Sequence, residues 1–69
     1  MTKINENLLK GAIAAKGMTQ ATLAKAINLT PSGLWRKMKN KNEFTLAEVR
    51  KIRDVLELPE DLLRAIFLL

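Results

Sequence analysis

The chain has 69 residues, a formal net charge of +5, and neither Cys nor His. This length holds one small domain, and the missing Cys and His exclude disulfides, zinc fingers and catalysis by imidazole or thiolate. With 48% hydrophobic and 28% charged residues, the composition is typical of a globular protein. We therefore expect a single folded domain over residues 1–69, with no cofactor, no metal and no small-molecule ligand.

The apolar runs are all far shorter than the roughly 20 residues that span a bilayer. No apolar segment typical of a signal peptide follows Met1 either. The sequence therefore predicts a cytoplasmic protein without a membrane segment.

The positive charge is concentrated in the first part of the chain. Residues 1–42 contain eight Lys or Arg and one acid, a formal charge of +7, whereas the remaining residues contain four bases and six acids, a formal charge of −2. A cationic segment of this kind favours a polyanionic partner.

Apolar residues recur at spacings of three and four, which predicts an all-α fold, a compact bundle of about five short helices. The first helix is expected over about 5–16, where Leu9, Ala12 and Ile13 form an inward stripe that Leu8 widens. Gly17 is placed to end this helix.

Two short helices are predicted next, over about 19–27 and 31–39. The expected inward face of the first is Leu23, Ala24 and Ile27. Thr19 and Thr30 are each suited to cap a helix N-terminus, and Pro31 fits the first helical position, where its missing N–H costs nothing. Asn28 lies between the helices and tolerates the left-handed backbone of a tight turn.

The second of these helices has a polar outer face. At 100° per residue, Leu34 and Met38 point inward and Trp35 and Lys37 lie on the two flanks. The opposite direction is occupied by Ser32, Arg36, Lys39 and Asn40. Such a helix suits a groove of nucleic acid. We expect Trp35 to pack mainly at the edge of the core.

A fourth helix is predicted after a loop over 40–44 that carries Lys41. Thr45 and Glu48 form a capping box, and the expected buried stripe is Leu46, Val49, Ile52 and Leu56.

The Leu58–Pro59 pair ends the fourth helix, and a last helix is expected over about 60–68. Its C-terminal half is more apolar than one helix face can bury in so small a domain. These side chains either fold back onto the core or meet a second chain. We favour an interface made of Leu63, Ile66, Phe67, Leu68 and Leu69.

The segment 20–37, QATLAKAINLTPSGLWRK, resembles the helix-turn-helix of the lambda and 434 repressor and Cro family. Gln20 opens the first motif helix, and Ala24 occupies the small-residue position where the two helices cross. Ile27, Leu29 and Leu34 fill the hydrophobic positions. With the pattern FTLAEVRKI at 44–52 and the closing Ile66–Phe67 pair, the chain is similar over roughly 5–68 to short phage-encoded regulators of this family.

The resemblance implies a Cro-like switch protein in a bacterial host, which binds operator DNA as a homodimer with 31–39 as recognition helix. Half-sites would then lie about one helical turn, or 34 Å, apart. With no second domain expected in 69 residues, a Cro-like antagonist is favoured over a full-length lysogenic repressor.

The candidate DNA-binding residues follow from this placement. Arg36 is the candidate for base readout, since a guanidinium bonds the guanine edge bidentately. Ser32 is a candidate for a base or a phosphate. Phosphate contacts are expected from Gln20 at the first motif helix and from the lysines. The complete candidate set is Thr19, Gln20, Thr30, Ser32, Gly33, Arg36, Lys37, Lys39, Asn40 and Lys41.

Two departures from the family pattern are Asn28, where Gly is most frequent, and the pair Pro31 and Gly33, which lack hydrogen-bonding side chains. The second departure keeps an alternative open, an antirepressor that binds a phage repressor protein. A protein that covers a basic DNA-binding face would present acids, whereas four of the six residues 36–41 are basic.

Membrane-surface binding is disfavoured, since the apolar stripes are committed to the core. An enzyme is disfavoured as well. The acids Glu57, Glu60 and Asp61 flank Pro59 at a helix start, where the helix dipole explains them.

Overall fold

The computed structural model describes residues 4–68, and this part of the chain is all-helical, without a strand. The expected all-α fold is thereby confirmed. The five helices are α1 (Glu6–Ala15), α2 (Gln20–Ala26), α3 (Pro31–Met38), α4 (Leu46–Leu56) and α5 (Glu60–Phe67). Within 4–68 no helix is long and apolar enough to cross a membrane, and no cluster of acidic side chains is suited to hold a metal ion.

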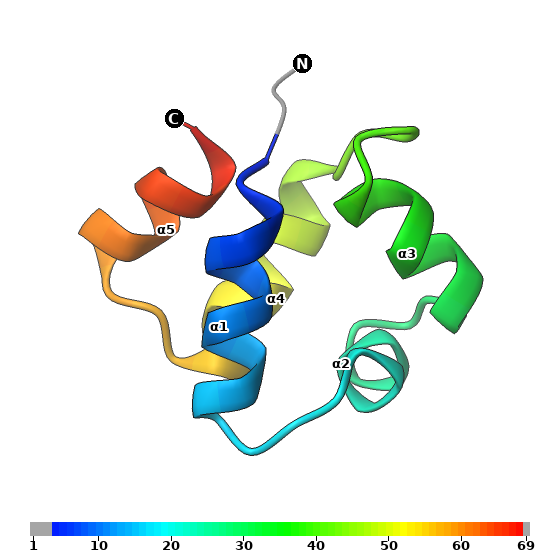
Figure 1. Ribbon diagram of the computed structural model, residues 1–69, viewed down its shortest axis with the longest axis horizontal. Coiled ribbons are helices and arrows are strands. Elements are labelled where there is room, and N and C mark those ends of the chain that lie inside the picture. Colours follow the sequence, from blue (N-terminus) through cyan, green and yellow to red (C-terminus); the bar gives the residue numbers. More distant parts are fainter. Residues whose placement is uncertain (1–3, 69) are drawn as a thin grey trace.

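The helices form a compact globule of about 26 × 26 × 21 Å. In Figure 1, α1 occupies the centre of the view, with α5 on one side and α2 and α3 on the other, while α4 lies behind α1. Helix α2 packs against α3, α1 and α4, and α1 packs against α5. The domain therefore keeps α3 and α5 on opposite sides of α1.

Side-chain caps start most of the helices, and α1 and α2 begin one residue after the expected positions because Asn5 and Thr19 are their caps, whereas α3 and α5 begin where expected. The hydroxyls of Thr19, Thr30 and Thr45 each accept a hydrogen bond from the backbone N–H three residues later. Asn5 caps α1 in the same way, through a bond from the N–H of Leu8 at 3.1 Å. Each cap satisfies a backbone donor that the helix itself leaves unpaired.

The turns at the helix ends use left-handed backbone. Gly17 and Asn28 have φ values of 74° and 64°, as expected from their positions after α1 and α2. Asn40 (φ 62°) and Glu57 (φ 53°) adopt the same conformation after α3 and α4. The segment 27–30 thus reverses the chain tightly between α2 and α3.

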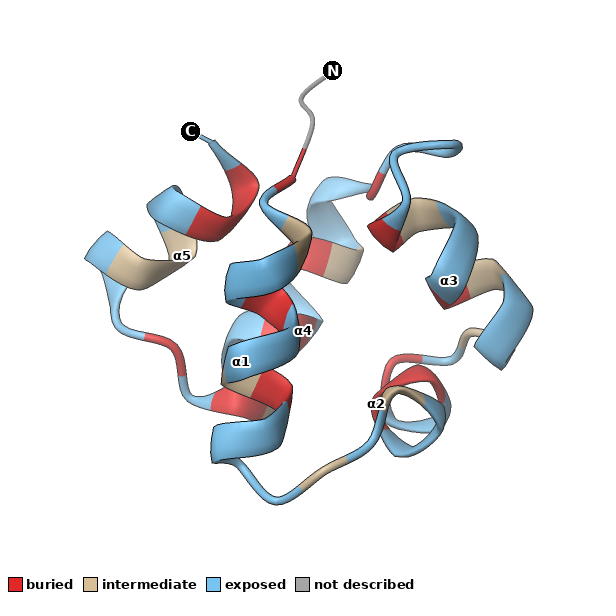
Figure 2. Cartoon of the chain, viewed as in Figure 1, coloured by how far each residue is buried: buried red, intermediate tan, exposed pale blue. Residues whose placement is uncertain are grey.

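The core is apolar and draws on every helix. Its buried residues are Ile4, Leu9, Ile13, Leu23, Ala24, Ile27, Leu34, Met38, Phe44, Val49, Ile52, Leu56, Leu58, Ile66 and Phe67. Figure 2 shows buried positions, in red, on the ribbon of every helix. The inward faces expected for α2 and α3 are confirmed.

Leu46 was expected in the buried stripe of α4, and this prediction is wrong, because the residue is 63% exposed. Leu46 is the first residue of α4, and it lies about a quarter-turn away from the direction of Val49, Ile52 and Leu56. At that end of the helix no neighbouring element covers it. Leu8, expected to widen the stripe of α1, is also 39% exposed.

Ile66 and Phe67, near the end of α5, fold back onto the core of this chain, which was one of the two alternatives for them. Both are buried within this chain, and the Phe67 ring meets Phe44 edge to face at a centroid distance of 5.5 Å. The expected interface is corrected for these two residues, because their side chains have no exposed surface left for a second chain. Leu63 is half-buried, Leu68 is 50% exposed, and Leu69 lies outside the described residues.

Candidate nucleic-acid interface

Helices α2 and α3 enclose an open groove on the surface of the domain. Figure 1 shows α2 nearly end-on and α3 from the side, so their axes cross steeply. The groove has a volume of about 570 Å³ and is lined by Gln20, Ala21, Pro31, Ser32, Trp35 and Arg36. Four of the candidate or flanking residues from the sequence, Gln20, Ser32, Trp35 and Arg36, are thereby brought together.

The outer face of α3 is exposed and cationic. Ser32, Arg36 and Lys39 are exposed, opposite the buried Leu34 and Met38 (Figure 2). No acidic group of residues 4–68 forms an ion pair with the Arg36 guanidinium. The exposed guanidinium of Arg36 therefore directs its N–H donors to whatever enters the groove.

The part of the sequence that forms the groove contains no acidic residue, because the chain has no Asp or Glu between Glu6 and Glu43. Both helices of the groove and the turn between them fall inside that interval. Glu6 and Glu48 each pair with one lysine of this region, and the remaining cations leave it with a net positive charge. Such a surface attracts anionic partners over about one Debye length, about 8 Å at physiological salt.

Trp35 is more exposed than expected. Its side chain is 46% exposed and lines the groove, although it had been assigned to the core edge. The Lys39 ammonium lies 5.9 Å from the centroid of the indole ring, a cation–π distance. The face of α3 thus combines an aromatic surface with two cations.

Lys39 forms an ion pair with Glu6 on α1. Its ammonium lies 2.9 Å from Glu6 Oε2, and the Lys10 ammonium lies at the same distance from that oxygen. Hydrogen bonds from Lys39 and then Lys10 hold the pKa of Glu6 below its ordinary value. The Lys39 side chain is 37% exposed and the Glu6 side chain 24% exposed, so solvent partly screens the pair.

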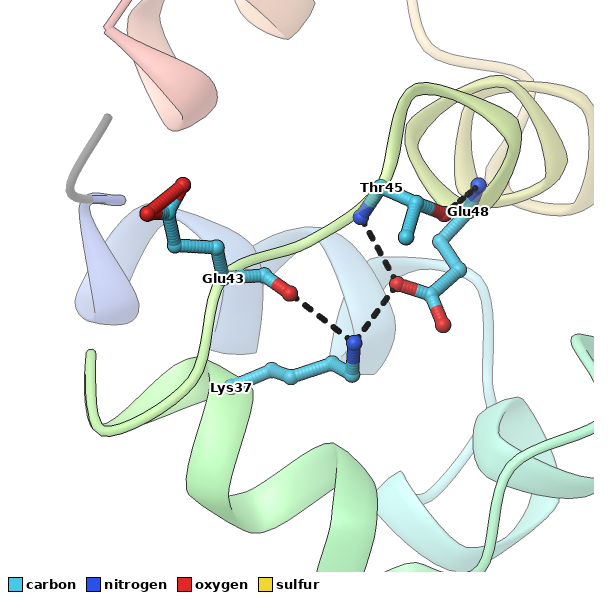
Figure 3. Close-up of polar contacts among 4 residues, drawn as sticks. All are labelled: Lys37, Glu43, Thr45 and Glu48. Carbon is cyan, nitrogen blue, oxygen red and sulfur yellow. Dashed lines mark hydrogen bonds and ion pairs between the residues drawn. The ribbon is translucent and has the colours of Figure 1, made fainter. Parts of the chain in front are cut away.

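Lys37 does not join the exposed face of α3, although it was a candidate phosphate contact. Its Nζ donates to Glu48 Oε1 at 2.8 Å and to the backbone carbonyl of Glu43 at 2.9 Å (Figure 3). The ammonium also lies 5.9 Å from the ring centroid of Phe44, and the side chain is only 15% exposed. Lys37 therefore ties the C-terminal half of α3 to the start of α4.

Glu48 is the acid at the centre of this contact. Besides Lys37, its Oε1 accepts the backbone N–H of Thr45 at 2.8 Å, which completes the capping box of α4 (Figure 3). Burial raises the pKa of Glu48, but the hydrogen bonds from Lys37 and Thr45 outweigh it and leave the pKa below the ordinary value of 4.5.

Glu48→Gln is expected to lower the free energy of unfolding near neutral pH by about 1 kcal/mol, because it removes an ion pair and weakens a cap. A carboxyl with a depressed pKa in the folded state stabilises above its unfolded pKa, and the stabilisation is lost as the pH falls through the folded pKa. Urea unfolding should therefore show the largest gap between wild type and variant above pH 4.5, with the gap closing on acidification.

Asp54→Asn is the matched control, since Asp54 pairs with Arg53 on the surface at 70% exposure. Its stability should change by less than about 0.5 kcal/mol. A Glu48→Gln variant as stable as the control at neutral pH would contradict the role given to the Lys37 contact.

Asn40 and the capping threonines have structural partners. The Oδ1 of Asn40 accepts a hydrogen bond from the backbone N–H of Ile4 at 2.8 Å. Asn40 is also the residue with the left-handed backbone conformation after α3. The hydroxyls of Thr19 and Thr30 accept from Thr22 and Gly33. These three side chains thus position the helices of the groove.

Gly33 is restricted by the cap in front of it. A Cβ at this position would lie 3.1 Å from Thr30 Oγ1, so a side chain would press on the capping hydroxyl. The same kind of cap is compatible with a side chain at the start of α2 and α4, where Thr22 and Glu48 occupy the equivalent position. Lys41 is exposed in the loop after α3 and has no ion pair within residues 4–68.

No family model, no curated protein and no solved structure matches this chain. The relation to the repressor and Cro family remains a prediction from the residues of segment 20–37. The roles of Lys37 and Asn40 could not be predicted from the sequence, because their partners Glu48 and Ile4 lie 11 and 36 residues away. The sequence did predict one role of Glu48, its part in the capping box with Thr45, but not its contact with Lys37.

Proposed function

We propose that this protein is a sequence-specific DNA-binding transcription regulator of the Cro type. In this proposal α2 and α3 are the two helices of a helix-turn-helix, and α3 lies in the major groove of operator DNA. The observation that carries the proposal is the exposed face of α3, where Arg36 lines a groove and forms no ion pair within residues 4–68, in a stretch of sequence without acids. A helix with a cationic outer face and a buried inner seam fits the major groove.

The side chains divide into base readers and phosphate binders. Arg36 is assigned to a guanine edge, and Ser32 lies beside it in the groove for a base or a phosphate. Lys41 and the side chain of Gln20 are assigned to the DNA backbone, together with Lys39 once a phosphate has replaced Glu6. Lys37 is left out of this set, because it is held by Glu48.

Binding as a two-fold homodimer is part of the proposal. A palindromic operator would carry two half-sites with centres about 34 Å apart, so that both copies of α3 reach the major groove on one side of the duplex. Repression of phage promoters in a bacterial host is the biological setting that the Cro resemblance suggests.

Lys41→Ala is expected to reduce the salt dependence of DNA binding, since each phosphate contact contributes about one unit to the slope of log K against log salt. Lys37→Ala removes the same charge from a side chain that is 15% exposed and already paired, so it should change the slope by much less. Fluorescence anisotropy with a labelled duplex over a range of salt concentrations measures both slopes. Equal loss of slope in the two variants would contradict the assignment of these lysines.

The experiment that tests the proposed function is a binding selection of the purified protein against a random pool of duplex DNA at near-physiological salt. Enrichment of a palindrome is the expected result, and its half-site spacing reports the geometry of the dimer. Retention without a consensus, or no retention, would overturn sequence-specific binding and direct the search to a repressor protein as partner.

A further inference from the structure

The groove between α2 and α3 is apolar along one wall. Ala21, Pro31 and Trp35 form that wall, and the polar lining residues Gln20, Ser32 and Arg36 complete the groove. Trp35 is 46% exposed, so a large apolar surface faces solvent beside the guanidinium of Arg36. Removal of this surface from water would favour binding of an apolar group.

The apolar wall restricts which base edges can fit against it. Pro31 has no backbone N–H, and the side chains of Ala21 and Pro31 neither donate nor accept hydrogen bonds. In the major groove, guanine, cytosine and adenine present hydrogen-bonding groups, whereas thymine also presents a 5-methyl group. Apart from the indole Nε1–H of Trp35, the wall has no hydrogen-bonding group, so a methyl group is the feature of a base edge that its apolar surface can recognise.

We propose that Trp35, with Ala21 and Pro31, reads thymine methyl groups in the major groove next to the base contacted by Arg36. The inference rests on the proposed function and names the class of sequence that the site prefers. Trp35 is then a specificity-determining residue, although its position on the flank of α3 first suggested packing at the core edge.

Charge favours DNA as the occupant of the groove over an apolar peptide. Arg36 lines the groove, and Lys39 lies over the indole ring of Trp35. No acid occurs between Glu6 and Glu43. An apolar surface next to two cations complements a ligand that has both an apolar methyl group and negatively charged phosphates. Thymine in duplex DNA has both properties.

The test replaces each thymine of the selected duplex, one at a time, by deoxyuridine. Deoxyuridine pairs with adenine as thymine does and differs from it only by the missing methyl group. Replacement of a thymine that contacts the wall should weaken binding of the wild-type protein by about fourfold, the effect of one buried methyl group. Replacements of thymines outside the two half-sites of the selected duplex should not change the affinity, and they serve as the control.

The protein side of the test uses Trp35→Ala, with Leu46→Ala as the matched control, since Leu46 is a 63% exposed apolar side chain outside the groove. Trp35→Ala should bind the thymine and deoxyuridine duplexes equally, and Leu46→Ala should keep the fourfold preference. The comparison of duplexes on the wild-type protein does not depend on how well either variant folds.

The outcomes separate this inference from the proposed function. Equal binding of the two duplexes by the wild-type protein would overturn thymine recognition while DNA binding stands. A preference that survives in Trp35→Ala would overturn the assignment to Trp35. Failure of the protein to select any duplex would overturn the proposed function, and thymine recognition with it.

Discussion

Arg36→Ala is expected to weaken binding to the selected duplex by about 1–3 kcal/mol, or about 5- to 150-fold, and to bring it close to binding of unrelated DNA. The reason is the position of the guanidinium, which is exposed in the groove and has no ion pair within residues 4–68. Loss of a bidentate base contact removes discrimination, whereas the lysines still supply the affinity for any duplex. Anisotropy titrations with the selected duplex and a scrambled duplex measure both affinities.

Arg64→Ala is the matched control for charge. Arg64 lies on α5, across α1 from α3 (Figure 1), and it is 64% exposed in a pair with Glu60. This variant loses the same formal charge and should retain the preference for the selected duplex. If Arg36→Ala also retained that preference, Arg36 would not be the base-reading residue, and the role of the outer face of α3 would be wrong.

Phe67→Ala is expected to destabilise the domain by about 3–5 kcal/mol, the usual cost of emptying a buried aromatic site. Phe67 is 1% exposed and packs edge to face on Phe44. A domain of this size has a total stability of only about 3–10 kcal/mol, so the substitution should remove a third or more of it. Thermal unfolding followed by circular dichroism should show a drop in Tm of more than about 12 °C.

Leu68→Ala provides the comparison for Phe67. Leu68 is the next residue and is 50% exposed, so its truncation should cost less than about 0.5 kcal/mol. If both variants unfolded at the wild-type temperature, Phe67 would not belong to the core of the folded chain. A surface role for the end of α5 would then be restored.

Local signals predicted the ends of the helices well. The hydroxyls of Thr19, Thr30 and Thr45 cap their helices within a single turn, and Asn28 needs no distant partner to adopt its positive φ. Interactions of this range are encoded in neighbouring residues, so spacing alone is enough to place them. The buried faces of α2 and α3 follow from helical periodicity in the same way.

Contacts between distant segments could not be predicted. Periodicity gives the direction in which Lys37 points from its helix. It does not show that Glu48 Oε1 lies 2.8 Å from the Lys37 Nζ. The same limit explains why Phe67 was expected at an interface, whereas the direction of Leu46, a quarter-turn from the buried stripe, could have been read from periodicity. For Leu46 and Phe67 alike, the neighbouring elements decide the final exposure, and this is set by the tertiary arrangement.

For the candidate site, the sequence placed Ser32 and Arg36 on the exposed face of α3, and the structure has them there. It could not separate Lys37 from Lys39 and Lys41, because a lysine on a helix flank reaches either solvent or a neighbouring helix. The exposure of Trp35 was equally open, since the covering of a flank position depends on how α2 and α3 cross.

The measurement that tests DNA binding by α3 most directly is an NMR titration of isotope-labelled protein with the selected duplex. We expect the largest amide shift changes at the groove residues Gln20, Ser32, Trp35 and Arg36, and small changes along α5. Changes confined to α5, with the amides of α3 unmoved, would contradict the proposed interface.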